Sequence, residues 1–191
     1  MNFLAVSGWV MTVAFGIYEL WRARKERTFN INRVILACRN LHKRMLSAGF
    51  YPEVIIVPGE KNALIAHFLK EFMADSPLVI VSTQVYRTQH ELEFQSDSLL
   101  EIKTTRSSLF FQSDLRDIVG RKILFLDSIK KSGTTMNAVT DYLQSIGVAT
   151  SELRTCCLID SKNYPHAPEP DFFFAKMSGK VSFPWQTVHV S

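Results

Sequence analysis

Cysteine is scarce in this sequence: its 191 residues include three cysteines, and two of them, Cys156 and Cys157, are adjacent. Three cysteines in this arrangement supply neither the disulfide framework of a small secreted domain nor a Cys-x-x-Cys pair for a metal ion. The sequence therefore favours a reducing compartment, in which the cysteines are ordinary buried thiols.

Repeats, long disordered runs and a Gly-x-x-x-x-Gly-Lys-Ser/Thr Walker loop are also absent. Positive charge is concentrated rather than spread, because the net charge of +4 reflects a cluster formed by Arg22, Arg24, Lys25 and Arg27. No basic face for specific nucleic-acid binding is therefore evident. A chain of 191 residues accommodates one α/β domain and an appendage.

The expected appendage is N-terminal. Residues 3–18 carry no charged side chain, and the apolar character continues to Trp21 around the single acid Glu19. About 19 residues at a rise of about 1.5 Å nearly span a hydrocarbon core of about 30 Å. The basic cluster follows directly, so the positive-inside rule places the C-terminal part in the cytoplasm. We predict a single-pass transmembrane helix with a basic juxtamembrane segment over residues 1–27, followed by a domain over 28–191.

Small and polar residues within this segment leave an apolar core helix or an interfacial helix as the alternative; these are Ser7, Gly8, Thr12 and Gly16. With Ala5, three of them form a ridge of small residues suited to helix pairing, so we expect a homo-oligomer. A cleaved signal peptide is not indicated, because neither a basic n-region nor a small-x-small cleavage site is obvious.

Beyond residue 28, strands and helices alternate. Apolar runs predict buried strands, and apolar residues at helical spacing predict amphipathic helices. The expected strands are 54–57, 78–83, 99–103, 123–126, 153–159 and 172–175, and the expected helices are 31–46, 63–73 and 136–146. This alternation predicts an α/β fold with a mainly parallel twisted sheet, flanking helices and a ligand site at the carboxyl edge of the strands.

The stretch 123–135 carries the strongest functional signal. Four apolar residues run into Asp127, which indicates a buried strand that ends at its polar carboxyl edge. After a short polar turn, Ser132-Gly133-Thr134-Thr135 opens the helix 136–146. Free N–H groups at a helix start, together with hydroxyl groups, bind phosphate. The alternative is an ordinary strand-to-helix turn capped by Ser or Thr.

This stretch resembles the phosphoribosyl-diphosphate-binding motif of type I phosphoribosyltransferases, in which four hydrophobic residues, two acids and a short flexible run precede Thr-Gly-x-Thr. The resemblance extends over residues 31–191 and implies a phosphoribosyltransferase-like fold. It implies that the turn from Ser132 to Thr135 binds a 5′-phosphate. It also implies that Asp127 and Ser128 occupy the position of the acid pair that binds the ribose hydroxyls, partly through Mg²⁺.

Two further segments match the family by position. A Pro-Arg-Gly-Gly loop of the family holds the pyrophosphate, and its place is taken here by Gly59, Glu60 and Lys61. The ending Phe183-Pro-Trp185 resembles the Phe-Pro-Trp-Glu ending of short xanthine-guanine-type members, which implies a base region at Phe183, Trp185 and Lys131. The alternatives are a tight turn in the first segment and an aromatic tail folded onto the core in the second.

Four departures from the family pattern cluster on its chemistry. Ser128 replaces one acid, Lys131 replaces an Asp of purine-type relatives, and Lys180 replaces an aromatic residue. In the pyrophosphate loop, Gly-Glu-Lys replaces Arg-Gly-Gly. We therefore expect a membrane-anchored member that binds a nucleotide or phosphoribosyl diphosphate, has weak or no transferase activity, and acts in sensing or assembly.

Two alternatives stay open. One is an active pentosyltransferase of altered substrate specificity, with Asp127 as the candidate catalytic residue, and the other is a structural membrane protein with a vestigial pocket. Lys130 and Lys131 indicate a polyanionic ligand or else form a solvated surface pair. Mg²⁺ is expected only with a bound ligand, through Asp127. The expected partners are that ligand, the membrane and a second copy of the chain.

Overall fold

The computed structural model describes residues 27–73, 79–87, 100–103, 107–111 and 115–185. The chain divides into two compact units, Met1–Ile31 with Ser178–Ser191, and Asn32–Met177. The larger unit contains a seven-stranded sheet, and the described part of the smaller unit contains a two-stranded sheet.

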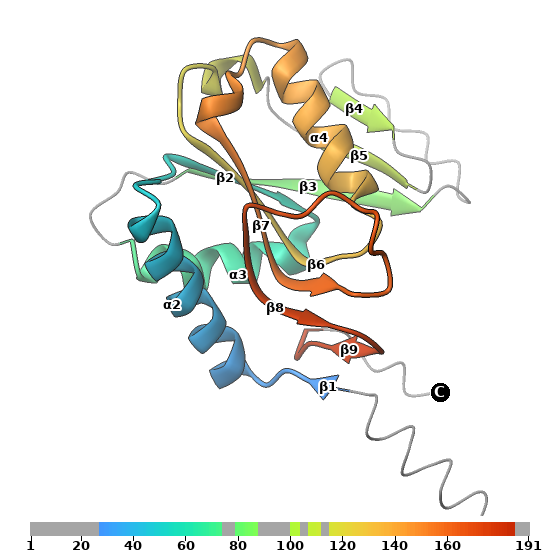
Figure 1. The fold of residues 1–191 in the computed structure, drawn as a ribbon. Helices are drawn as coiled ribbons and strands as arrows, with labels where there is room; N and C mark the ends of the chain where they lie inside the picture. The colour runs from blue at the N-terminus through green and yellow to red at the C-terminus, as the bar shows by residue number, and fades with distance from the viewer. Residues whose placement is uncertain (1–26, 74–78, 88–99, 104–106, 112–114, 186–191) are drawn as a thin grey trace, which may run out of the picture. The chain divides into compact units, whose positions relative to one another are not determined.

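A seven-stranded sheet forms the larger unit, in the order β4-β5-β3-β2-β6-β7-β8 (Figure 1). The five strands β3, β2, β6, β7 and β8 are neighbours in that order, and each pairs in parallel with the next. Strand β5 pairs antiparallel with both β3 and β4. The strands are β2 Val54–Pro58, β3 Val79–Arg87, β4 Leu100–Lys103, β5 Ser107–Phe111, β6 Ile123–Lys130, β7 Leu153–Ser161 and β8 Phe172–Met177.

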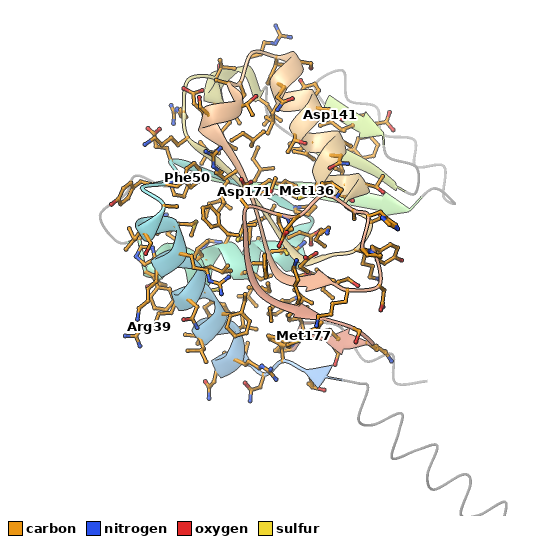
Figure 2. All side chains as sticks on the ribbon, in the orientation of Figure 1. Arg39, Phe50, Met136, Asp141, Asp171 and Met177 are labelled. Atoms are coloured by element: carbon orange, nitrogen blue, oxygen red, sulfur yellow. The ribbon has the colours of Figure 1, made fainter. Side chains whose placement is uncertain are left out.

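Helices cover both faces of this sheet. They are α2 Ile31–Ser47, α3 Glu60–Glu71 and α4 Thr134–Ser145, with short 3₁₀ turns at Leu115–Ile118 and Thr150–Glu152. Figure 1 shows α4 on one face and α2 with α3 on the other. In α2 the exposed side chain of Arg39 points away from the sheet (Figure 2).

The alternation of side chains along a strand explains these two layers. Ile123 and Phe125 of β6 are buried in one cluster with Val139 and Leu143 of α4. The intervening residues Leu124 and Leu126 are fully buried as well. A central parallel strand covered on both faces is therefore apolar at every position, which is why 123–126 reads as a continuous hydrophobic run.

The mainly parallel α/β sheet is confirmed, and several element boundaries differ from expectation, two of them next to the candidate site. The prediction that the central strand ends at Asp127 is wrong, because β6 continues to Lys130 through register pairs with β7, including Ile129 with Ile159. Helix α3 begins at Glu60, before the expected start at residue 63, because Gly59 takes a positive φ of 80° and turns the chain directly into the helix.

In the smaller unit, β1 Arg27–Thr28 pairs in parallel with β9 Val181–Ser182. The Phe29 N–H donates to the Ser182 carbonyl at 2.9 Å. The ring of Phe183 lies 5.2 Å from that of Phe29 and 4.9 Å from that of Trp185, measured between centroids. The aromatic tail therefore packs against the segment that precedes α2.

Among the residues that the structure describes, no helix is long and apolar enough to cross a membrane. The expected transmembrane segment lies in residues 1–26, outside the described part, and it stays a prediction.

Candidate functional site

The carboxyl ends of β2 and β6 flank the switch point of the sheet. From β2 the chain passes through α3 to β3 on one side, whereas from β6 it passes through α4 to β7 on the other. Adjacent parallel strands whose connections diverge leave a crevice at their carboxyl ends, where open α/β sheets bind ligands. Both predicted ligand loops, β2–α3 and β6–α4, therefore open at one place.

The β6–α4 turn has the geometry of an anion site. Gly133 occupies the N-cap position of α4 with a left-handed conformation, φ 77°. Its carbonyl accepts the first helical hydrogen bond, from the Asn137 N–H at 2.8 Å. The hydroxyls of Ser132 and Thr134 lie 2.8 Å apart. No acidic residue stands in the first turn of α4, so no side chain of that turn opposes an anion at its N–H groups.

Asp127 lies on β6 before this turn, and its carboxylate is held from two sides. Its Oδ1 accepts from the Ser128 N–H at 2.6 Å and from the Asn62 side-chain amide at 3.0 Å. The same amide donates to the Pro58 carbonyl at 2.7 Å. Asn62 thus joins the end of β2 to the acid on β6.

Burial raises the pKa of Asp127 from 3.8 to about 6, because a desolvated carboxylate is less stable than a hydrated one. The N–H groups of Ser128 and Ile129, the Asn62 amide and the Ser128 hydroxyl lower the pKa and oppose this effect in part. Near neutral pH the group is mainly ionised, and it carries the negative charge needed to orient hydroxyls or a cation.

Asn62 was not predicted from the sequence. The residue is 8% exposed and lies in the first turn of α3. The signal available was an amide directly before an apolar helical run, Ala63-Leu-Ile-Ala66, in a loop already assigned to a ligand. Helix starts commonly contain Asn, so this pattern alone does not reveal a partner on another strand.

The other predicted site residues are placed as follows. Ser128 lies beside Asp127, and the turn from Ser132 to Thr135 follows on the same β6–α4 connection. Gly59 ends the β2 loop, Glu60 opens α3, and the Lys61 side chain is exposed. Lys131 is exposed next to the turn. Phe183 and Trp185 belong to the smaller unit, so their role at the base stays a prediction.

Both interpretations of Lys130 are wrong. Its side chain is buried, with 5% of the residue exposed, and its Nζ lies 2.7 Å from Asp160 Oδ1. Lys130 is therefore neither a cation available to a ligand nor a solvated surface residue. The cause is the continuation of β6, which places Lys130 opposite Asp160 on β7.

Within the described residues, no group of three or more His, Cys, Asp or Glu side chains could hold a metal ion. Asp127 and the Ser128 hydroxyl do supply oxygen atoms, which Mg²⁺ prefers, and Mg²⁺ commonly uses one carboxylate together with substrate phosphates. The residues present therefore fit a cation that arrives with a phosphorylated ligand.

Solved structures with this fold include several phosphoribosyltransferases. A purine phosphoribosyltransferase from Pyrococcus horikoshii matches with 17% identity and a TM-score of 0.62, over 87% of this chain and 97% of that one. A Neisseria gonorrhoeae protein with bound ppGpp matches with 15% identity and a TM-score of 0.64, over 87% and 92%. A hypoxanthine phosphoribosyltransferase from Staphylococcus aureus matches with 19% identity and a TM-score of 0.54, over 76% and 73%.

No curated protein matches the chain in sequence. The sequence pattern of the phosphoribosyl transferase domain, in contrast, matches residues 27–191 and so covers both β1 and the β6–α4 turn. Together with the parallel sheet and the turn at its switch point, this match identifies the chain as a member of the phosphoribosyl transferase domain family.

Proposed function

We propose that this protein binds a 5′-phosphorylated ribose ligand, a nucleotide or phosphoribosyl diphosphate, and that it has little or no transferase activity. The observation that carries the proposal is the β6–α4 turn, in which Asp127 precedes a left-handed Gly133 and the open first turn of α4. The N–H groups and hydroxyls of this turn receive the 5′-phosphate. Asp127 then orients the ribose hydroxyls.

Asp127 and the Ser128 hydroxyl would hold a Mg²⁺ ion that arrives with the ligand, and the ion would supply positive charge for a diphosphate group. Lys130 does not supply positive charge for a pyrophosphate leaving group, because it is paired with Asp160, and the Gly-Glu-Lys loop offers the single cation Lys61 beside the acid Glu60. Displacement of pyrophosphate requires that charge in the transition state. Ser128 and Lys131 also lack the carboxylates that the family pattern places there. These residues favour ligand binding over catalysis, with a role in sensing or assembly.

The second candidate is an active transferase of altered specificity. It is favoured by the purine and hypoxanthine phosphoribosyltransferases among the solved structures of this fold. The Neisseria gonorrhoeae protein, which holds ppGpp, instead favours a binding protein and adds ppGpp to the ligands to be tested.

Membrane attachment is part of the proposal. The apolar segment 3–18 followed by four basic residues supports a single-pass anchor, with the phosphoribosyltransferase-like domain in the cytoplasm. Cells that express the full chain, or a chain beginning at Thr28, are fractionated with and without detergent. Retention of only the full chain in the membrane fraction is expected, whereas equal solubility of both excludes the anchor.

The binding proposal is tested with Gly133→Val. A β-branched residue at φ 77° is strained whatever space surrounds it, so the turn cannot keep its shape. Each lost charge-assisted hydrogen bond is worth about 1.5–3 kcal/mol, so affinity falls at least about tenfold. Calorimetry with GMP, ppGpp and phosphoribosyl diphosphate measures the change.

Gly120→Val is the matched control for this experiment. Gly120 has a similar φ of 83°, and a Cβ there meets no atom within 4 Å. It lies in the turn before β6, at the opposite end of that strand from Gly133. Equal affinity of the parent and the Gly133→Val protein for all three ligands refutes binding at this turn.

A further inference from the structure

The connection between β7 and β8 differs from the others in the parallel sheet. Parallel neighbours are usually joined through a helix, but residues 162–171 contain none. Three prolines, at positions 165, 168 and 170, stiffen this connection because each one fixes its own φ. The connection is therefore a restrained irregular strap, here called the β7–β8 strap.

The strap packs against the candidate phosphate turn. A Cβ built on Gly133 would lie 3.5 Å from both Cγ and Cδ of Pro168 and 3.7 Å from Met136 Cε. Figure 2 shows Met136 on α4, with Asp171, the residue before β8, labelled for orientation. A proline ring from a segment far along the chain therefore lies beside the glycine at the N-cap of α4, within van der Waals reach of a side chain at that position.

The next residue of the strap, Glu169, forms an ion pair with a lysine of the sheet. Glu169 Oε1 lies 2.7 Å from Lys176 Nζ, and this carboxylate is the main cause that raises the pKa of Lys176. Lys176 on β8 stands in register with Asp160 on β7, at 3.8 Å between Nζ and Oδ2. Asp160 in turn stands in register with Lys130 on β6.

A row of alternating charge therefore crosses three neighbouring strands and ends on the strap. Its inner members, Lys130 and Asp160, are each 5% exposed, so both are buried in the sheet. Its outer members, Lys176 and Glu169, are exposed. Substitution of Glu169 or Lys176 breaks their ion pair without leaving a buried charge unpaired. The effect of losing this pair can therefore be measured separately from the cost of an unpaired buried charge.

We propose that Glu169 and Lys176 are positioning residues for the phosphate turn. Their ion pair holds Pro168 against Gly133 and so keeps the first turn of α4 in the conformation that receives a phosphate group. The binding of a phosphate group at this turn rests on the function proposed above, whereas the effect of the ion pair on the turn requires no ligand.

The readout is the first hydrogen bond of α4, from the Asn137 N–H to the Gly133 carbonyl. Hydrogen exchange of the Asn137 amide is measured on the ligand-free full-length protein, for the parent, Glu169→Gln and Lys176→Gln. The ion pair is exposed and its loss is a small perturbation, so exchange is expected to accelerate about two- to fivefold. The Leu143 amide, farther along α4, reports any general loss of stability.

Two further variants serve as controls. Lys176→Arg keeps the cation and should retain the exchange rate of the parent. Lys162→Gln removes one positive charge from the start of the same strap, where no ion pair of Lys162 is observed among the described residues, and it should change nothing. Unchanged Asn137 exchange in both Gln variants overturns the proposal, and so does equal acceleration in Lys162→Gln or at Leu143.

Binding of phosphoribosyl diphosphate in the presence of Mg²⁺ is measured on the same proteins. A weaker affinity in Glu169→Gln and Lys176→Gln, with Lys176→Arg at the parent value, extends the positioning role to the ligand. If Asn137 exchange responds as expected but the parent binds no phosphorylated ligand, the proposed function fails, while the positioning role of the Glu169–Lys176 ion pair stands.

Discussion

The side-chain amide of Asn62 donates to Asp127 at 3.0 Å and so connects the first turn of α3 to β6 at the switch point of the sheet. Asn62 and Asp127 lie 65 residues apart in sequence. Because Asn62 also donates to the Pro58 carbonyl, a shift of either loop changes the environment of the carboxylate. The site therefore behaves as one unit rather than as two separate loops.

Replacing Asn62 by Leu tests this connection. The amide is one of the groups that lower the pKa of Asp127, so its loss should move that pKa above the present value of about 6. Carboxyl ¹³C NMR titration of the parent and the variant measures the change. Asn40→Leu is the control, because the Asn40 side chain donates to the Leu36 carbonyl within α2. An unchanged Asp127 pKa in Asn62→Leu contradicts the connection.

Asp127 also makes stability depend on pH. Its pKa is raised from 3.8 to about 6 in the folded protein, so between these values the folded state binds more protons than the unfolded state. The free energy of unfolding therefore falls as pH rises from about 4 to about 6, by at most about 3 kcal/mol from this group. Asp127→Asn should remove this contribution, which urea denaturation at pH 4, 5, 6 and 7 detects. Parallel stability curves for the two proteins would exclude it.

The buried pair of Lys130 and Asp160 should be sensitive to the loss of one partner. Asp160→Leu leaves Lys130 buried without its partner at 2.7 Å, and such changes cost about 3–5 kcal/mol. The double change Lys130→Met with Asp160→Leu replaces both charges by apolar groups and should recover most of that loss. Chemical denaturation compares the three proteins. A double variant no more stable than Asp160→Leu contradicts this account.

Catalysis can be tested by restoring the acids of the family pattern. The parent protein should release little or no pyrophosphate from phosphoribosyl diphosphate with guanine, xanthine or hypoxanthine. Ser128→Asp together with Lys131→Asp should introduce Mg²⁺-dependent sugar binding, and general acid–base help is worth about 10²–10⁴-fold in rate. A coupled pyrophosphate assay measures both proteins. Rapid release by the parent with any of these bases favours the active transferase instead.

The parallel sheet could be predicted from the sequence because its strands are local apolar runs. The stretch 123–135 combined such a run with a glycine and four hydroxyl residues, so both β6 and the turn were evident. Antiparallel β5, Ser107–Phe111, was not predicted, because Ser107 and Ser108 shorten its apolar run.

Contacts between distant segments were beyond a sequence argument. Asn62 meets Asp127, and Lys130 meets Asp160, only through the order and register of the strands. A lysine after a strand usually indicates a solvated position, and only the extension of β6 buries this one. The position of Pro168 beside Gly133 likewise depends on the path of a segment without regular structure.

The last strand of the sheet has a consequence for assembly. An edge strand presents unpaired backbone groups to which a strand of another molecule can add. On β8, however, the Phe173 carbonyl already accepts a hydrogen bond from Arg44 of α2, and the Arg44 guanidinium lies 5.7 Å from the Phe173 ring centroid. Lys176 places a further charge on the same strand, and lysine on an edge discourages strand addition. Copies of this chain that associate should therefore do so through helices or loops rather than by joining their sheets at β8.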